Sequence, residues 1–177
     1  AKSANMQYDL SKSHDSIFRE YLALVGGEIV MGDEAKNIIG EPIGRKPGSI
    51  VEWMVRPDGK PAWTEYMVLA HSWKTSLVRV HLLTGRTHQI RAHMKHIGHT
   101  LFNDERYEGN IIMRGVNLPK YKQFVQNVFE VLPRHALHAH TLGFIHPVTK
   151  KELYFESPMP KDMQEASERW RKYLENN

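Results

Sequence analysis

Cysteine is absent from all 177 residues of the sequence. Its absence excludes disulfide frameworks, thiolate metal sites and cysteine nucleophiles. A folded chain of this length removes roughly 70 % of its unfolded surface from water, so it needs no such cross-link for stability. The sequence also lacks internal repeats, Ser/Gly-rich linkers, a signal-peptide pattern and any apolar run near the ~20 residues that span a bilayer. We therefore expect a single cytoplasmic domain over residues 1–177, with no membrane segment.

Acidic residues are missing from two long stretches. The window from Tyr66 to Asn103 contains none, although it carries five Lys or Arg and six His residues. The window from His135 to Lys151 is also free of acids and adds four His and two Lys residues. Two basic stretches of this kind are typical of a surface that binds a polyanion. A second interpretation is that both stretches are ordinary solvent-exposed surface with no partner. Charge alone does not decide between the two, because the net charge is only +4.

The abundant histidines lack the spacing of a metal site. A helical zinc site needs two histidines at i and i+4 together with a carboxylate or a thiolate. His93 and His96 are three residues apart, and no acid lies near them in the sequence. We therefore predict no metal and expect hydrogen-bonded histidines. Gly-x-Ser-x-Gly and Walker patterns are missing too, which argues against a serine hydrolase and against a P-loop nucleotide site.

Short apolar and alternating segments predict an α+β fold, with a mixed and mainly antiparallel sheet and flanking helices. Residues 50–55 and 63–70 flank an Asp-Gly turn within residues 56–60, so we expect these two strands to form a hairpin. The predicted strands span residues 19–25, 50–55, 63–70, 76–82, 139–145 and 152–155.

Apolar residues at helical spacing predict the helices that flank the sheet. Thr87 follows a turn and is suited to cap a helix over residues 88–98. In that helix Ile90 and Met94 fall on the apolar face, which leaves Arg91 at the rim of the space between helix and sheet. The other predicted helices span residues 1–14, 121–132 and 161–174.

The segment Leu83–His93, which reads LTGRTHQIRAH, resembles the third motif of the RluA-type RNA pseudouridine synthases. The match is specific because a strand end, a Gly-Arg-Thr-His-Gln turn and an Ile-Arg pair on the first helical turn coincide. The resemblance covers essentially the whole chain, with Thr100 where proline is usual and Glu108 inserted before a glycine. Other segments that agree in the family's order are residues 19–25, 97–104, 106–109, 136–139 and 142–147.

The resemblance implies that the chain acts on ribosomal or transfer RNA and isomerises uridine to pseudouridine without a cofactor. The target uridine is flipped out, an aspartate helps to break the bond from ribose to the base nitrogen, and the uracil rejoins through carbon. Taken singly, Tyr21 and Arg91 would be a core tyrosine and a surface arginine. By similarity they become the stacking platform and the guanidinium that keeps the aspartate ionised. Similarity also assigns substrate contacts to Arg86, Thr87, His88 and Gln89, and a pocket wall to Leu142.

The aspartate of that family is not found in this chain. It belongs to a His-Arg-Leu-Asp motif that lies upstream in the family and is absent from these 177 residues. We therefore expect the chain to be the C-terminal portion of a catalytic domain and to be inactive by itself. A sheet edge exposed by the missing strand could pair with a second chain. The alternative from a different class is a non-catalytic RNA-binding module that keeps the basic cleft.

Overall fold

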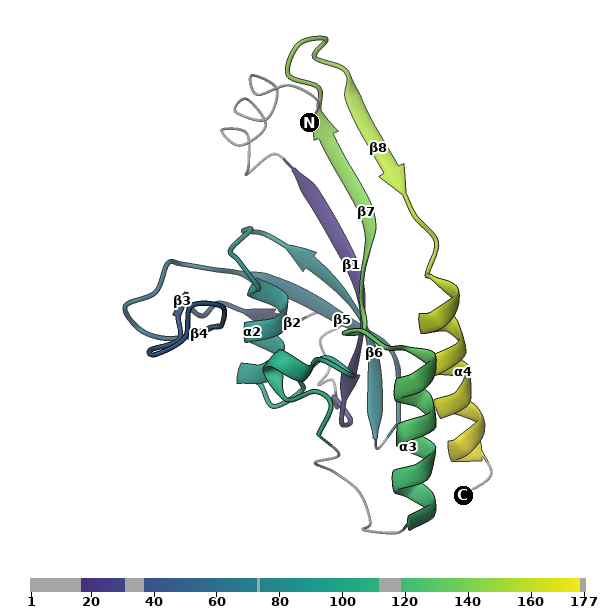
Figure 1. The fold of residues 1–177 in the computed structure, drawn as a ribbon. Helices are drawn as coiled ribbons and strands as arrows, with labels where there is room; N and C mark the ends of the chain where they lie inside the picture. The colour runs from purple at the N-terminus through teal and green to yellow at the C-terminus, as the bar shows by residue number, and fades with distance from the viewer. Residues whose placement is uncertain (1–16, 31–36, 73, 112–118, 176–177) are drawn as a thin grey trace.

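A six-stranded antiparallel sheet forms the centre of the molecule in a computed structural model, which describes residues 17–30, 37–72, 74–111 and 119–175 (Figure 1). All neighbouring strands pair antiparallel, which confirms the predicted α+β class. In spatial order the strands are β2 (Asn37–Ile39), β5 (Thr64–His71), β6 (Thr75–Leu82), β1 (Phe18–Gly26), β7 (Leu137–Ile145) and β8 (Glu152–Glu156).

The hairpin predicted between residues 50–55 and 63–70 is wrong. Strand β4 (Trp53–Val55) pairs instead with β3 (Ile43–Arg45), and β5 pairs with β2 and β6. The Asp-Gly turn folds the chain back against β3, where the backbones of Lys60 and Ile43 exchange two hydrogen bonds. Gly59 permits this close approach, because a Cβ there would lie 2.5 Å from the carbonyl carbon of Ile43.

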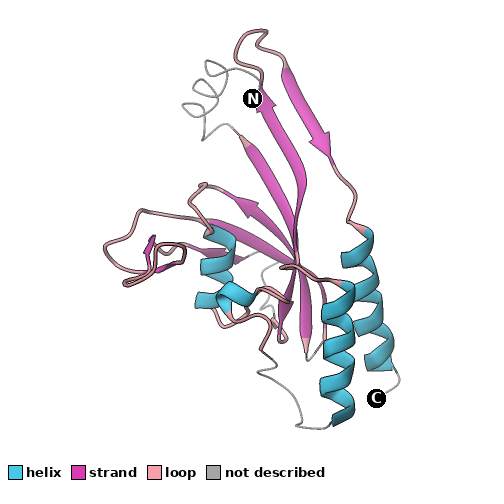
Figure 2. Ribbon diagram, in the orientation of Figure 1, coloured by secondary structure: helices cyan, strands magenta, loops and turns pink. Residues whose placement is uncertain are grey.

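Helices cover both faces of the sheet (Figure 2). One face carries α2 (Gln89–His96), and the other carries α3 (Pro119–Val131) and α4 (Lys161–Glu175). A short 3₁₀ helix, η2 (Glu105–Tyr107), follows α2. These helices confirm three of the four predicted ones, and the predicted helix 1–14 lies outside the described residues. Among the described helices, none has the length and apolar character needed to cross a membrane.

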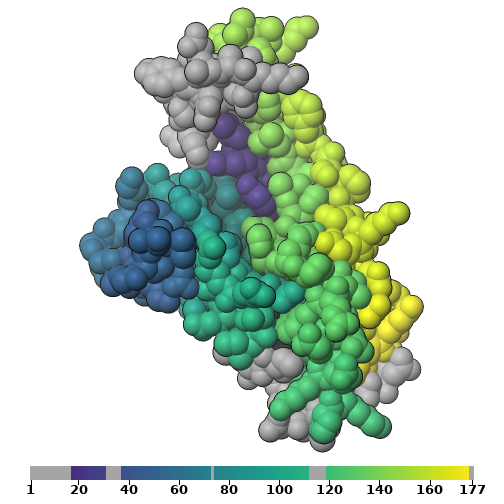
Figure 3. Space-filling model, viewed as in Figure 1, coloured from purple at the N-terminus to yellow at the C-terminus, as the bar shows by residue number. Residues whose placement is uncertain are grey.

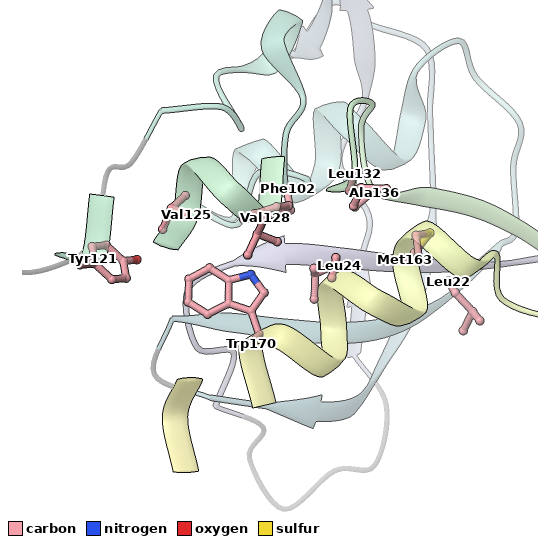
Figure 4. Close-up of a cluster of buried hydrophobic side chains, with 11 residues drawn as sticks. Leu22, Leu24, Phe102, Tyr121, Val125, Val128, Leu132, Ala136, Met163 and Trp170 are labelled. Carbon is pink, nitrogen blue, oxygen red and sulfur yellow. The ribbon is translucent and has the colours of Figure 1, made fainter. Parts of the chain in front are cut away.

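Strand β1 divides the core because its side chains alternate between the two faces. Ala23 and Val25 join the cluster beneath α2, whereas Leu22 and Leu24 join the cluster beneath α3 and α4. Figure 4 shows the latter cluster, with the Trp170 indole beside Val128 and Leu24. The α2 cluster is completed by Ile29, Ile39, Val78, Val80, Leu82, Ile90, Met94 and Leu101.

A buried arginine site at the start of helix α2

Arg91, on the first turn of α2, forms a two-point ion pair with Asp104. Its Nε lies 2.7 Å from Oδ2 and its Nη2 lies 2.6 Å from Oδ1. The side chains are only 12 % and 1 % exposed, so the pair is largely removed from water. A guanidinium has five N–H donors in a fixed plane. Asp104 occupies the edge formed by Nε and Nη2, which leaves donors on Nη1 and Nη2 for other partners.

A short loop between Leu101 and Gly109 holds Asp104 in place. The loop is anchored to the sheet, because the Phe102 amide donates to the Leu24 carbonyl at 2.9 Å. Gly109 closes it by donating its amide to the Asp104 carbonyl at 2.7 Å. A Cβ on Gly109 would lie 1.8 Å from the Leu101 carbonyl oxygen, so only glycine fits. The position of Asp104 therefore follows from backbone contacts with the central strand.

Tyr107 supports the guanidinium from one side. The Cζ atom of Arg91 lies 4.5 Å from the centroid of the tyrosine ring, a cation–π arrangement. The Tyr107 hydroxyl accepts the Trp53 amide at 3.0 Å and lies 2.9 Å from Nδ1 of His88. The side chain is 3 % exposed, and burial raises the pKa of its hydroxyl. Tyr107 thus links α2 to strand β4.

His88 completes the network by contacting both Arg91 and Tyr107. Its Nε2 lies 3.3 Å from Nη1 of Arg91, and one tautomer satisfies both contacts of the ring: Nδ1–H donates to Tyr107 and Nε2 accepts from Arg91. Burial and the positive charge of Arg91 lower the pKa of His88, which favours this neutral form.

The backbone of His88 corrects the predicted helix start. His88 is the residue that precedes α2, and it adopts a left-handed conformation with φ of 54°. No side chain caps this end of the helix, so the predicted capping by Thr87 is wrong. Thr87 is exposed and lies immediately before the left-handed His88. The turn at residues 87–88 therefore separates Thr87 from the first residue of the helix. The turn instead presents the His88 ring to Arg91.

A polar depression borders the ion pair. Burial and the nearby Arg91 lower the pKa of His135, which lines the depression together with Arg91. Arg134, another lining residue, is paired with Asp162. Within the described part of the chain, no three His, Asp or Glu side chains gather as metal ligands would. The residues that line the depression are Arg91, Asn103, Asp104, Glu105, Arg106, Pro133, Arg134 and His135.

Gln89, predicted to contact substrate, is instead used inside the protein. It is 2 % exposed, and its carboxamide makes four hydrogen bonds of 2.9 Å each. The oxygen accepts from the Thr84 hydroxyl and the Arg86 amide, and the nitrogen donates to the Trp63 carbonyl and the Thr64 hydroxyl. These bonds satisfy both ends of the group. A substrate contact by Gln89 stays a prediction that this arrangement does not favour.

Arg86 and Thr87 are both exposed on the turn before α2. The Nε of Arg86 donates to the Pro61 carbonyl at 2.9 Å, which fixes the side chain at its base. The turn therefore offers an anchored cation and a hydroxyl to solvent next to the arginine site.

Tyr21 and Leu142 lie on the same face of the sheet as α2, but outside the hydrogen-bonded network of Arg91. Tyr21 packs against the α2 cluster. A bulge opposite the step from Glu20 to Tyr21 shifts the register, so that Leu142 faces Arg19. Because directly paired residues share a face, the bulge brings Leu142 to the side of Tyr21. In Figure 3 the start of β1 (purple) is visible between teal residues and the light green β7.

Sequence reasoning did not find Asp104 and Tyr107 as parts of the site. Two signals were present in the sequence: Asp104 is the first acid after the acid-free window, and Asp104 and Tyr107 lie in the segments 97–104 and 106–109 that agree with the family's order. Arg91 and Asp104 are 13 positions apart in the sequence, and nothing local indicated that the two side chains meet.

A family model described as RNA pseudouridylate synthase matches residues 1–96, which is more than half of the chain. The chain belongs to the RNA pseudouridylate synthase family. This membership confirms the resemblance drawn from the Gly-Arg-Thr-His-Gln segment. In this chain His88 and Arg91 lie in that segment, whereas their partners Asp104 and Tyr107 lie at η2.

Two curated relatives illustrate the match. Ribosomal large subunit pseudouridine synthase D of Vibrio parahaemolyticus is 38 % identical over 161 residues, which make up 90 % of this chain and 47 % of that protein. An uncharacterized RNA pseudouridine synthase, YjbO, of Bacillus subtilis is 37 % identical over 145 residues, covering 82 % of this chain and 44 % of that protein. The chain spans about half the length of the curated relatives it matches.

Solved structures of the family have the same fold. Human RNA pseudouridylate synthase domain containing 1 superimposes with a TM-score of 0.63 at 26 % identity, covering 88 % of this chain and 59 % of that one. Human RNA pseudouridylate synthase domain containing 4 gives a TM-score of 0.64 over 96 % of this chain and 69 % of that one. At 18 % identity the second match supports the fold alone.

Proposed function

We propose that this chain forms the uridine-binding part of an RNA pseudouridine synthase. The observation that carries the proposal is the buried Arg91 guanidinium, which Asp104 and Tyr107 hold rigidly in place. After its bonds to Asp104 and His88, Nη1 and Nη2 each retain one N–H. A second carboxylate can bind there. A guanidinium in that position keeps such an acid ionised in a partly dry site.

The reaction is an isomerisation that needs no oxidant, reductant or cofactor. The bond between ribose C1′ and N1 of uracil breaks, and a bond between C1′ and C5 forms. The proton on C5 is lost to solvent and N1 takes up a proton, so atoms and charge balance. The carboxylate that assists the first step is the family's aspartate, which these 177 residues do not contain. We expect another stretch of polypeptide to supply it beside Arg91.

The other predicted site residues have roles that fit their positions. Tyr21 offers an aromatic ring on the α2 face for the flipped base, and base–aromatic stacking stabilises by ~1–3 kcal/mol. Leu142, 40 % exposed on the same face, can wall the pocket. Arg86, Thr87 and His88 lie on the turn beside Arg91, where ribose or phosphate oxygens would find donors.

Ribosomal RNA is the substrate that we favour over transfer RNA. The support is the name of the Vibrio relative, a ribosomal large subunit synthase that matches 90 % of this chain. The polar depression beside Arg91 is flanked by further arginines, which suits a phosphate backbone. A cytoplasmic location and pairing with a second chain through a sheet edge stay predictions.

An activity assay tests the proposal. RNA with tritium on uracil C5 would be incubated with this chain alone, and with the chain fused behind the aspartate-bearing half of the Vibrio parahaemolyticus synthase. We expect tritium release by the fusion only. Changing the donated aspartate to asparagine should abolish tritium release. Arg91→Lys should lower kcat with a smaller change in KM, because lysine cannot bind two carboxylates in fixed geometry.

The outcomes separate the two functional hypotheses. A chain that binds RNA but gives an inactive, folded fusion would favour the non-catalytic RNA-binding module. A chain that binds no RNA would contradict both. Tritium release by the isolated chain would show that an acid within these residues, with Asp104 the first to examine, supports the chemistry.

A further inference from the structure

His88 has a left-handed backbone conformation although it is not a glycine. Its φ of 54° lies in a region that residues with a Cβ rarely adopt, because the backbone is strained there. Strain of this kind persists only where surrounding contacts impose it, and it is concentrated at functional sites. The contacts that hold His88 in this conformation therefore indicate what the residue does.

Left-handed backbone is concentrated around the Arg91 guanidinium. Among the residues that the structure describes, four non-glycine residues have a positive φ, and three of them lie at this site. His88 contacts the guanidinium directly. Asn103 and Glu108 immediately flank residues 104–107, which include its ion-pair and cation–π partners. The strained positions thus coincide with the groups that hold one cation in place.

Three contacts fix the Arg91 guanidinium, and each acts on a different part of it. Asp104 binds the edge formed by Nε and Nη2, and the ring of Tyr107 lies 4.5 Å from Cζ. A group held at one edge and one face can still rock in its own plane about the carboxylate. The third contact, 3.3 Å from Nη1 to Nε2 of His88, restrains this motion.

The His88 ring can restrain Arg91 in only one protonation state. Nε2 must be unprotonated to accept from Nη1, so the proton of the neutral ring belongs on Nδ1. Nδ1 lies 2.9 Å from the Tyr107 hydroxyl, which the Trp53 amide holds in place at 3.0 Å. The Tyr107 hydroxyl therefore supplies the acceptor that stabilises the tautomer required by Arg91.

We propose that His88 is a positioning residue for the isomerisation: by accepting from Nη1, its ring holds the Arg91 guanidinium in the orientation that receives the second carboxylate. The proposal rests on the proposed function and adds one residue to it. Both nitrogens of the ring are engaged inside the protein, so the ring acts on the reaction through Arg91.

Protonation of His88 would remove the restraint. A proton on Nε2 converts the acceptor into a donor and places a second positive charge beside Arg91. Burial and the charge of Arg91 lower the pKa of His88; Arg106 and His135 act in the same direction, and Asp104 opposes them. We therefore expect a neutral ring at pH 7.5, and a kcat of the fusion that falls only below about pH 6.5.

Nitrogen NMR tests the hydrogen-bond geometry independently of activity. In this chain, labelled with nitrogen-15 histidine, long-range spectra at pH 7.5 should show His88 protonated on Nδ1 and unprotonated on Nε2. Tyr107→Phe removes the hydroxyl but keeps the ring beside Arg91, so it should raise the share of the other tautomer. A wild-type His88 that carries its proton on Nε2 would overturn the proposal.

Kinetics of the fusion test the positioning role. His88→Asn removes the ring, and asparagine tolerates a left-handed backbone, so the change adds little strain. We expect kcat to fall about tenfold or more, the range for losing one hydrogen bond to a charged group, with a much smaller change in KM. The fall in kcat between pH 6.5 and 5.5 should also become smaller than in wild type.

Two matched histidine variants control for this result. His96→Asn changes an exposed histidine on the same helix and should leave kcat unchanged. His135→Asn removes the other histidine near Arg91 and should keep the acid-side fall in kcat, because His88 still titrates. If His135→Asn abolishes that fall and His88→Asn retains it, the titrating group is His135 and the proposal is wrong.

The remaining outcomes separate positioning from other roles. A purely structural His88 would give His88→Asn a lower melting temperature but a wild-type kcat and pH profile per folded molecule. A loss expressed mainly in KM would indicate a direct contact with RNA and would also overturn the proposal. A wild-type fusion that releases no tritium would contradict the proposed function, whereas the NMR result would still decide whether His88 holds Arg91.

Discussion

The two faces of the sheet use buried side chains in different ways. Beneath α3 and α4 the core is dominated by rings, with Trp170 contacting Phe102, Tyr121 and Phe124 at centroid distances of 4.9–6.3 Å. Beneath α2 the apolar cluster adjoins buried polar groups, among them Gln89 and His93. Aromatic packing stabilises the fold but does not hold any single polar atom in a defined position. Hydrogen-bond networks fix atoms, which is what a catalytic site requires.

Ion pairs on the two faces show the same difference. Arg171 and Glu168 form a 2.6 Å pair on α4, and Arg171 lowers the pKa of Glu168 to about 2. Both groups are exposed, so water screens the attraction and the pair adds little stability. The Arg91–Asp104 pair is buried and leaves an uncompensated charge if either partner is removed. Of these two pairs, the buried Arg91–Asp104 pair is the one that can hold its side chains in a fixed orientation.

The largest expected effect is on the aromatic face. Trp170→Ala should lower the free energy of unfolding by ~3–5 kcal/mol, because it leaves a cavity among the packed rings. RNA affinity per folded molecule should be unchanged, since α2 lies on the other side of the sheet. Denaturant titration and RNA binding measure the two quantities. Trp170→Phe is the control and should have a much smaller effect; equal loss in both variants would argue against cavity formation.

Asp104→Asn should lower the unfolding free energy less than Trp170→Ala does. It should lower the activity of the fusion more, because Asp104 orients the Arg91 guanidinium. The change should lower the unfolding free energy by ~2–3 kcal/mol, somewhat below the usual loss for a broken buried pair, because asparagine keeps one acceptor oxygen. Arg91→Met should show a similar loss. The double variant should be more stable than the two losses added together predict, and a double-mutant cycle measures this coupling. Strict additivity would mean that the two side chains do not interact in solution.

The smallest effect is a pH dependence confined to the α2 face. Burial lowers the folded-state pKa of His88, His93 and His135 below the ordinary value near 6.5. The unfolded chain therefore binds protons first as the pH falls, so this stability is full above about pH 6.5 and is lost below it. Urea titrations at pH 7.5 and 5.5 should give a lower unfolding free energy at pH 5.5. His93→Gln should reduce the difference; equal stability at both pH values would contradict the assignment.

Much of the fold could be predicted because it follows from local periodicity. Strands β1 and β6 and helices α2, α3 and α4 lie where the apolar pattern indicated, with ends shifted by a few residues. The pairing of β4 could not be predicted from the sequence. The Asp-Gly turn allows β4 to pair with β5, which follows the turn, but it does not exclude pairing with β3, which precedes β4. The choice was made by the close contact of Gly59 with Ile43, two residues that are distant in sequence.

The sequence by itself determined the family, through a motif that combines a strand end, a turn and the first turn of a helix, and it identified Arg91 as the central cation. Tertiary structure alone decided that Asp104 binds this cation, that Gln89 faces inward and that a bulge turns Leu142 toward Tyr21. The physical reason is that local patterns encode which face of an element is buried. Hydrogen bonds and ion pairs between distant segments depend on how the loops close over the sheet, and no periodicity in the sequence records that.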